Sequence, residues 1–504
     1  MAAPAIVTDQ IRTTHRSGIA VIWGASVVGL VAALCIPTAS WGIGFPAVVI
    51  AAFAVSQGLR RFSVVKRDPW ADCPWIGILL FSVLFAWHDA LELRFMNLMM
   101  VALFVGIIAI KADGKPISQA SVYDYPFRAL GSWFVAFIDT FTLLWTDIHW
   151  KSIPKNGSDK KLAAAGRGLL LAAPLVLIFG ALFINADAGF EGLLKRIFSF
   201  DAEAIFQMCL TGGIFAWMAA GMWRRTFVGS SPVLAVSSMA PPKAPPRLGA
   251  TEVGIILGSL NLLFLLFVST QWRYFVGGAE VIRSTEGLGV ATFARRGFFE
   301  LATVSGLVLP TLLGLHSLAD PDDKRLMRLY KIMASVLVVL LTFVMHSAWI
   351  KMQLYMESFG LTTLRLYVAA MLVWLVGVFG WFAMTILKGR VNRFAFGAVV
   401  AFAGMVLGLN VINPDRFVAR WNLSHQKAEE IDWGYLTQLS NDAVPTLIES
   451  WDRIPMEHRS VLADQLLDQH SDRADWRSQT FSSQEARQRI SGREDEIRKA
   501  IASP

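Results

Sequence analysis

Long apolar runs constrain what this chain can fold into more than any other feature of its sequence. Eleven of them approach the length of about 20 residues that an α-helix needs to cross roughly 30 Å of hydrocarbon. They lie at 18–37, 42–58, 75–88, 95–110, 168–185, 203–223, 251–271, 298–317, 332–350, 367–387 and 394–412. The sequence therefore predicts an all-α, polytopic transmembrane bundle of about eleven spans.

The composition agrees with a membrane protein. Of the 504 residues, 55% are hydrophobic and 17% are charged, whereas a soluble domain carries about 25% charged residues. The net charge of +8 raises the question of nucleic acid, but the Lys and Arg residues lie in short loops between apolar runs and not on one polar face. The lipid bilayer is the predicted partner, nucleic acid is not, and protein partners are left open.

A twelfth stretch, 126–147, carries Arg128, Asp139 and Asp147 among apolar residues at helical spacing. That pattern is typical of an amphipathic helix lying in the membrane interface. The loops test this interpretation, because cytoplasmic loops carry an excess of Lys and Arg. With 126–147 on the surface, 25 Lys and Arg residues fall inside and 9 outside, whereas each side holds 17 if the stretch crosses. We therefore predict eleven spans, a cytoplasmic N-terminus and a C-terminal tail outside.

The predicted organisation has two parts, a transmembrane bundle over 1–413 and a soluble helical tail over 414–504. The tail is polar and of mixed charge, and its apolar spacing predicts short helices. They are expected at 433–451, 456–468 and 483–501. At the other end of the chain, Arg12 and Arg16 precede an apolar run that is long for a signal peptide, so we predict an uncleaved first span.

The sequence contains none of the common nucleotide-binding, zinc-protease or hydrolase motifs. Its cysteines, Cys35, Cys73 and Cys209, lie within or beside apolar runs with no paired spacing, so they predict neither disulfides nor a zinc site. The sequence thus predicts no cofactor and no metal. It leaves open whether the protein is an enzyme and which residues would be catalytic.

Polar residues at the ends of four apolar runs form the candidate site. In the eleven-span topology these ends share the outer level of the membrane, where ionisable side chains usually face a cavity or a partner. The candidates are Gln271, Arg273, Arg295, Arg296, Glu300, His346, Lys351 and Arg365. If the ends converge, this outer-face cluster is suited to the phosphate or carboxylate of an anionic lipid or a lipid-linked phosphate. A structural explanation stays open, because Arg296 and Glu300 can pair along one helix and Arg273 and Arg365 can reach lipid headgroups.

Several stretches resemble a bacterial family of multi-pass membrane proteins that is catalogued as a domain of unknown function. The similar segments are 271–278, 294–301 (Ala-Arg-Arg-Gly-Phe-Phe-Glu-Leu), 347–355, 360–367, 413–423, 432–436, 442–445 and 475–478. The resemblance covers most of the chain except about its first 40 residues. It implies a bacterial inner-membrane protein and implies no activity.

Three functions follow as alternatives from these observations. The first is a transporter or lipid-handling permease whose outer-face cluster binds an anionic group. The second is a membrane enzyme of envelope lipid or glycan assembly, for which Glu300 and His346 are the acid/base candidates. The third is a membrane signalling or scaffold protein that uses its tail to bind a partner.

We expect Arg295→Ala and Arg296→Ala to weaken the binding of anionic lipid more than Arg390→Ala does, because only the first two belong to the outer-face cluster. Native mass spectrometry of the lipid-bound protein measures the difference. Equal binding by all three variants would contradict an anionic site at this level.

Overall fold

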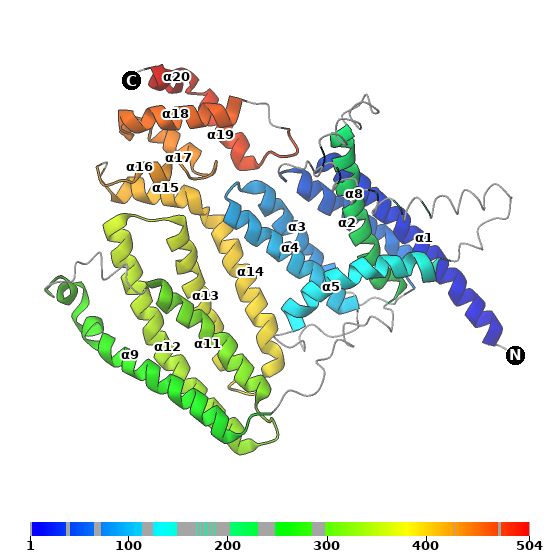
Figure 1. The fold of residues 1–504 in the computed structure, drawn as a ribbon, viewed down its shortest axis with the longest axis horizontal. Helices are drawn as coiled ribbons and strands as arrows, with labels where there is room; N and C mark the ends of the chain where they lie inside the picture. Colours follow the sequence, from blue (N-terminus) through cyan, green and yellow to red (C-terminus); the bar gives the residue numbers. More distant parts are fainter. Residues whose placement is uncertain are drawn as a thin grey trace. The chain divides into compact units, whose positions relative to one another are not determined.

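The described part of the chain is helical. The computed structural model describes residues 3–36, 41–64, 72–112, 124–148, 202–229, 247–284, 298–427, 429–471 and 475–502, with six single positions between 168 and 187. Apart from one isolated bridge between Leu248 and Ala319, the regular structure of these residues consists of helices (Figure 1). The predicted all-α class is confirmed.

By packing, the chain forms two compact units. Unit 1 comprises Met1–Ile117, Tyr123–Met239 and a short part of the tail, Asp472–Gln484. Unit 2 comprises Ser118–Val122, Ala240–Ser471 and Glu485–Pro504. The predicted boundary at residue 413 concerns the membrane and stays a prediction.

Unit 1 is a bundle in which small residues allow close helix packing. Its main helices are α1 (Ala3–Cys35), α2 (Gly44–Leu59), α3 (Cys73–Trp87), α4 (Leu91–Ala112), α5 (Asp124–Thr142) and α8 (Ala202–Trp223), and π-helical turns extend α5 (η4, Leu143–Asp147) and α8 (η6, Arg224–Val228). A Cβ atom added to Gly29 would lie 2.6 Å from the carbonyl oxygen of Gly212. Gly24 faces Trp223, so α1 and α8 run antiparallel. Close approach of this kind holds membrane helices together, because apolar side chains gain little over lipid.

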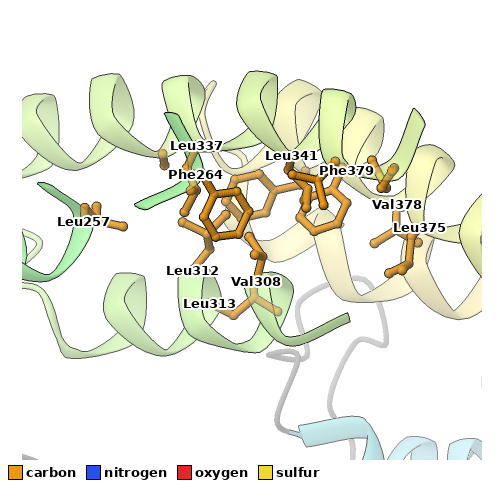
Figure 2. Packing of buried hydrophobic residues seen from close by; sticks show 14 of the residues in the cluster. Leu257, Phe264, Val308, Leu312, Leu313, Leu337, Leu341, Leu375, Val378 and Phe379 are labelled. Carbon is orange, nitrogen blue, oxygen red and sulfur yellow. The ribbon is translucent and has the colours of Figure 1, made fainter. Parts of the chain in front are cut away.

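Unit 2 contains a second bundle of long helices. These are α9 (Ala250–Ser284), α11 (Phe298–Leu318), α12 (Lys324–Phe359), α13 (Thr363–Thr385) and α14 (Phe394–Ile412). Leu257, Phe264, Leu312 and Leu341 belong to one apolar core between these helices (Figure 2). Asn261 donates from Nδ2 to the carbonyl oxygen of Met333 at 3.1 Å, which ties α9 to α12 by a polar contact inside that apolar surrounding.

The tail residues of unit 2 form a small helical module. Its elements are α15 (Pro414–His425), α16 (Trp433–Leu436), α17 (Val444–Glu449), η9 (Trp451–Arg453), α18 (Met456–Ser471), the later part of α19 (Phe481–Ser491) and α20 (Glu494–Ala502). The module packs on the turn between α12 and α13, where the Asn422 amide exchanges hydrogen bonds of 2.7 and 2.8 Å with the backbone of Leu361. The single helix predicted over 433–451 is wrong, because Asp432 caps a first short helix and Pro445 opens a second.

Eight helices among the described residues are long and apolar enough to cross a membrane by length and composition. They lie in α1, α4, α8, α9, α11, α12, α13 and α14. Two further predicted spans coincide with α2 and α3, which have 16 and 15 residues. The predicted span 168–185 lies almost wholly outside the described residues. The chain is a multi-pass membrane protein, and the number eleven stays a prediction.

The outward surfaces of these helices are apolar. Trp23 is 71% exposed, Ile76 is 70% exposed and Leu263 is 60% exposed. Large exposed apolar side chains on most of the long helices are typical of helices that face lipid. Lipid in contact with these side chains accounts for their exposure.

Candidate functional site

The predicted outer-face cluster lies in unit 2, where Glu300 and Arg365 belong to the first turns of α11 and α13, whereas Gln271 and His346 lie within α9 and α12. The structure describes the side chains of Gln271, Glu300, His346, Lys351 and Arg365. Arg295, Arg296 and the side chain of Arg273 lie outside the described residues.

The packing of α9 on α12 brings two members of the cluster to one level. A Cβ atom on Gly254 of α9 would meet Leu329 of α12, and a Cβ atom on Gly258 would meet Met333. The two contacts are four residues apart on each helix and in the same order, so α9 and α12 run parallel. The same offset places Gln271 level with His346. Gln271 is half-buried and His346 is exposed.

Of the charged cluster members whose side chains the structure describes, Lys351 is the most buried. Its side chain lies on α12 with a residue exposure of 8%, and the carboxylate of Glu300, at the start of α11, is close enough to interact favourably with its ammonium group. A cation in this position is available to an anionic group only to the extent that Glu300 does not already neutralise it.

Arg365 has a structural task in the turn between α12 and α13. Its guanidinium donates to the carbonyl oxygens of Phe359 and Gly360, which end α12. It also lies 4.0 Å from the ring centroid of Tyr355. These contacts satisfy the last carbonyls of α12, so Arg365 serves as a helix cap.

Unit 1 contains a cavity that the sequence did not predict. Its volume is about 360 Å³, and it lies between α1, α2, α3, α4, α5 and α8. Six aromatic side chains line it: Trp41, Phe45, Trp75, Trp133, Phe215 and Trp223. Aliphatic residues make up most of the remaining wall, and the hydroxyl groups that line it belong to Ser56 and Thr226.

The cavity is elongated along the helices. On α2 its wall runs from Phe45 to Ser56, which at 1.5 Å per residue is about 16 Å. One end is marked by Trp41, whose ring stacks on Phe45 with centroids 5.6 Å apart. The other end is marked by Thr226 on η6. We refer to these as the Trp41 end and the Thr226 end.

A buried ion cluster contains Arg224 and Arg225, the two residues that directly precede Thr226 in the sequence. Arg224 donates from Nη1 to Asp139 at 3.0 Å and from Nε to Asp147 at 2.6 Å, and Arg225 donates from Nε to Asp139 at 3.0 Å. The Asp139 side chain is fully buried, and that of Arg225 is 2% exposed. Two arginines and two aspartates balance in charge, so this ion cluster fastens α5 to α8 and does not attract a free anion.

The ion cluster fixes which face of α5 points inward. Asp139, Thr140 and Ser132 are buried, whereas Phe134 and Phe137 are 60% and 48% exposed. The polar face is thus turned into the protein and the aromatic face away from it. Helix α5 is not among the eight candidate spans, and its predicted place in the membrane interface stays a prediction.

A short part of the tail packs against the residues that follow Trp41 in unit 1. We call residues 475–484 the docked tail segment. Gly42 donates from its backbone to the carbonyl oxygen of Arg477 at 3.1 Å, and Ile43 to that of Gln479 at 2.9 Å. Gly42 has to be glycine here, because a Cβ atom would lie 2.2 Å from the Gln479 oxygen.

An internal ion pair shapes the docked tail segment. Arg477 donates from Nε to Asp475 at 2.5 Å, and this contact lowers the pKa of the Asp475 carboxyl below its ordinary value. The same contact raises the pKa of the Arg477 guanidinium. Both groups therefore stay charged at neutral pH, which holds the pair together.

The sequence contained each of these residues without showing how they combine. Asp139 and Asp147 lie in a stretch that fits either a span or an interfacial helix. Arg224 and Arg225 follow an apolar run, as cytoplasmic loop charges do. Their pairing joins positions 77 to 86 residues apart, so it could not be found from local spacing. The tryptophans of the cavity resemble ordinary interfacial anchors in sequence.

These features define a multi-pass α-helical membrane protein with an apolar cavity. A family described as a domain of unknown function (DUF4153) matches residues 75–450, and the chain belongs to this family. No curated protein and no solved structure matches the chain.

Replacing Asp139 by Asn should destabilise unit 1 strongly. Removing one partner of a buried ion pair costs about 3–5 kcal/mol, because the remaining charge stays buried. The matched control is Asp320→Asn, whose pair with Arg247 is exposed and worth about 1 kcal/mol or less. Thermal unfolding in detergent compares the two, and equal shifts in Tm would contradict a stabilising ion cluster.

Acid should loosen the docked tail segment. Since the folded pKa of Asp475 is lowered, its stabilising contribution is full at neutral pH and is lost as the pH falls through that value, below about 4. Hydrogen exchange of the Ile43 amide, corrected for its intrinsic rate, measures the docking. Asp475→Asn should lower protection at pH 7 and remove the acid dependence; an unchanged acid response in this variant would contradict the assignment.

Proposed function

We propose that this protein handles membrane lipid and that the cavity of unit 1 holds a hydrocarbon chain. The observation that carries the proposal is the cavity wall, which combines aromatic and aliphatic side chains with two hydroxyl groups. Its volume of about 360 Å³ falls in the range of small-molecule sites, roughly 300–1,000 Å³. Its length along α2 suits one extended chain.

The energetics favour an apolar occupant over water. Contact between this apolar wall and water is unfavourable, whereas hydrocarbon covers the same wall without that cost. Ordered water needs two to four polar partners, and two hydroxyl groups cannot supply them along the whole cavity. Hydrocarbon is abundant around a membrane protein and needs no hydrogen bonds.

The wall argues against chemistry inside this cavity. An enzyme that acts on a bound lipid needs an acid, a base or a nucleophile within hydrogen-bond reach of the reacting atoms. Ser56 and Thr226 supply hydroxyl groups only, and Thr226 already donates to the Met222 carbonyl oxygen at 2.8 Å. Binding and movement of lipid therefore fit the cavity better than an envelope-building reaction.

The outer-face cluster enters the proposal as a place for an anionic headgroup. Lys351 is a buried cation in this cluster, and it supports this role to the extent that the Glu300 carboxylate does not already neutralise it. Arg365 does not, because its guanidinium is occupied by the end of α12. Recognition of the anion would then rest on Lys351 together with Arg273, Arg295 and Arg296.

We further propose a bacterial inner membrane as the location, with the N-terminus in the cytoplasm and the tail outside. Two observations support the side assigned to the tail. The docked tail segment lies at the turn before α2, and the helical module lies at the turn between α12 and α13. The distribution of Lys and Arg among the loops places both of these turns on the outer side.

Filling the cavity should abolish chain binding. Ala102→Trp puts a large side chain into the wall, whereas Met99→Trp on the same helix changes a residue that is 42% exposed on the outer surface. Labelling by a diazirine-bearing palmitate should fall about tenfold in Ala102→Trp, which corresponds to about 1.4 kcal/mol, and stay unchanged in Met99→Trp. Equal labelling of both variants would overturn the proposed function.

A further inference from the structure

The Trp41 end of the cavity is built from two distant parts of the chain. Trp41 lines the cavity and lies against Phe45 and Phe215, with ring centroids 5.6 and 5.9 Å away. The residues that follow Trp41 pair with the docked tail segment through their backbone amides. A movement of that segment therefore acts directly on the turn that carries Trp41.

Beside this turn, the docked tail segment is also anchored to the ends of two helices, α1 and α3. Arg477 donates from Nη1 to the Leu34 carbonyl oxygen, at the end of α1, at 3.2 Å. Ser482 donates from Oγ to the Trp87 carbonyl oxygen, at the end of α3, at 2.9 Å. The ring of Phe481 lies 5.3 Å from that of Trp87 between centroids.

These anchors are separable from the cavity wall. No residue of the docked tail segment is among those that line the cavity. The anchors are a few hydrogen bonds and one ring contact, and a single hydrogen bond makes only a modest net contribution to stability. Contacts of this strength open locally without unfolding the bundle.

We propose that the docked tail segment is a clasp that controls how fast a hydrocarbon chain enters and leaves the cavity at the Trp41 end. This inference rests on the proposed function of the cavity. The clasp holds the turn before α2 while it is docked. Its release frees the ring of Trp41 to move away from Phe45 and Phe215, while Arg94 continues to donate to the Trp41 carbonyl oxygen. Since the clasp lies outside the wall, it changes the barrier to exchange and leaves the affinity of the bound chain as it is.

The test uses the purified full-length protein in detergent micelles with cis-parinaric acid as the probe. Energy transfer from the cavity tryptophans reports binding, and a chase with excess palmitate gives the dissociation rate. Two variants undo the clasp in different ways. Arg477→Ala removes the anchor to α1, and Gly42→Ala pushes a Cβ atom against the Gln479 carbonyl oxygen. Arg489→Ala is the control, because Arg489 lies further along α19 and pairs with Glu449 of α17.

The expected result is that association and dissociation both become about tenfold faster in the two clasp variants, with an unchanged Kd, while Arg489→Ala behaves as the wild type. If Gly42→Ala does not fold, Arg477→Ala alone carries the test.

Wild-type exchange rates in the clasp variants would overturn the clasp and leave the proposed function standing, provided that Ala102→Trp still loses the probe. A weaker Kd with an unchanged association rate would also overturn it, because the segment would then be part of the wall. Absence of energy transfer in the wild-type protein would overturn the proposed function itself.

Discussion

Inside a bilayer the backbone has to satisfy its own hydrogen bonds, because hydrocarbon offers none. The long helices of both units meet this constraint within each segment. The same constraint governs side chains: polar groups have to find partners within the protein, and apolar ones can face lipid. Trp23 and Ile76 are largely exposed, whereas Asp139 and Arg225 are buried against each other. The cavity follows as well, since a wall with few hydrogen-bonding groups suits an occupant that needs none.

The buried ion cluster shows how strongly this constraint orders the fold. Asp139 accepts from two consecutive arginines, and Asp147 accepts from one of them, so four charges neutralise one another away from water. Moving any one of them would leave a buried charge without its partner. The orientation of α5 and the π-helical end of α8 are therefore fixed together. Trp133 of α5 and Trp223 of α8 line the cavity, so the shape of the cavity depends on the same contacts.

The two candidate regions differ in how much of them the sequence could indicate. The ends of apolar runs predict the outer-face cluster, and that cluster stays a prediction. Arg365 shows the limit of that reasoning, because a guanidinium at a helix end is equally suited to capping the preceding helix, and the fold of the turn decides which role it takes. The docked tail segment had no local signal at all, since Arg477 contacts Leu34 across 443 residues of chain.

The sequence by itself determined the helical class, the membrane location and the positions of most long helices, because these depend on the length and hydrophobicity of continuous segments. It also indicated a polar helical tail. Only the tertiary structure decided that α5 turns its carboxylates inward, that six helices line one apolar cavity, and that one short part of the tail belongs to unit 1. The physical reason is that these features are made by pairs and groups of residues far apart in the chain. The chemical character of each residue follows from the sequence, but the contacts between these residues depend on how the helices pack.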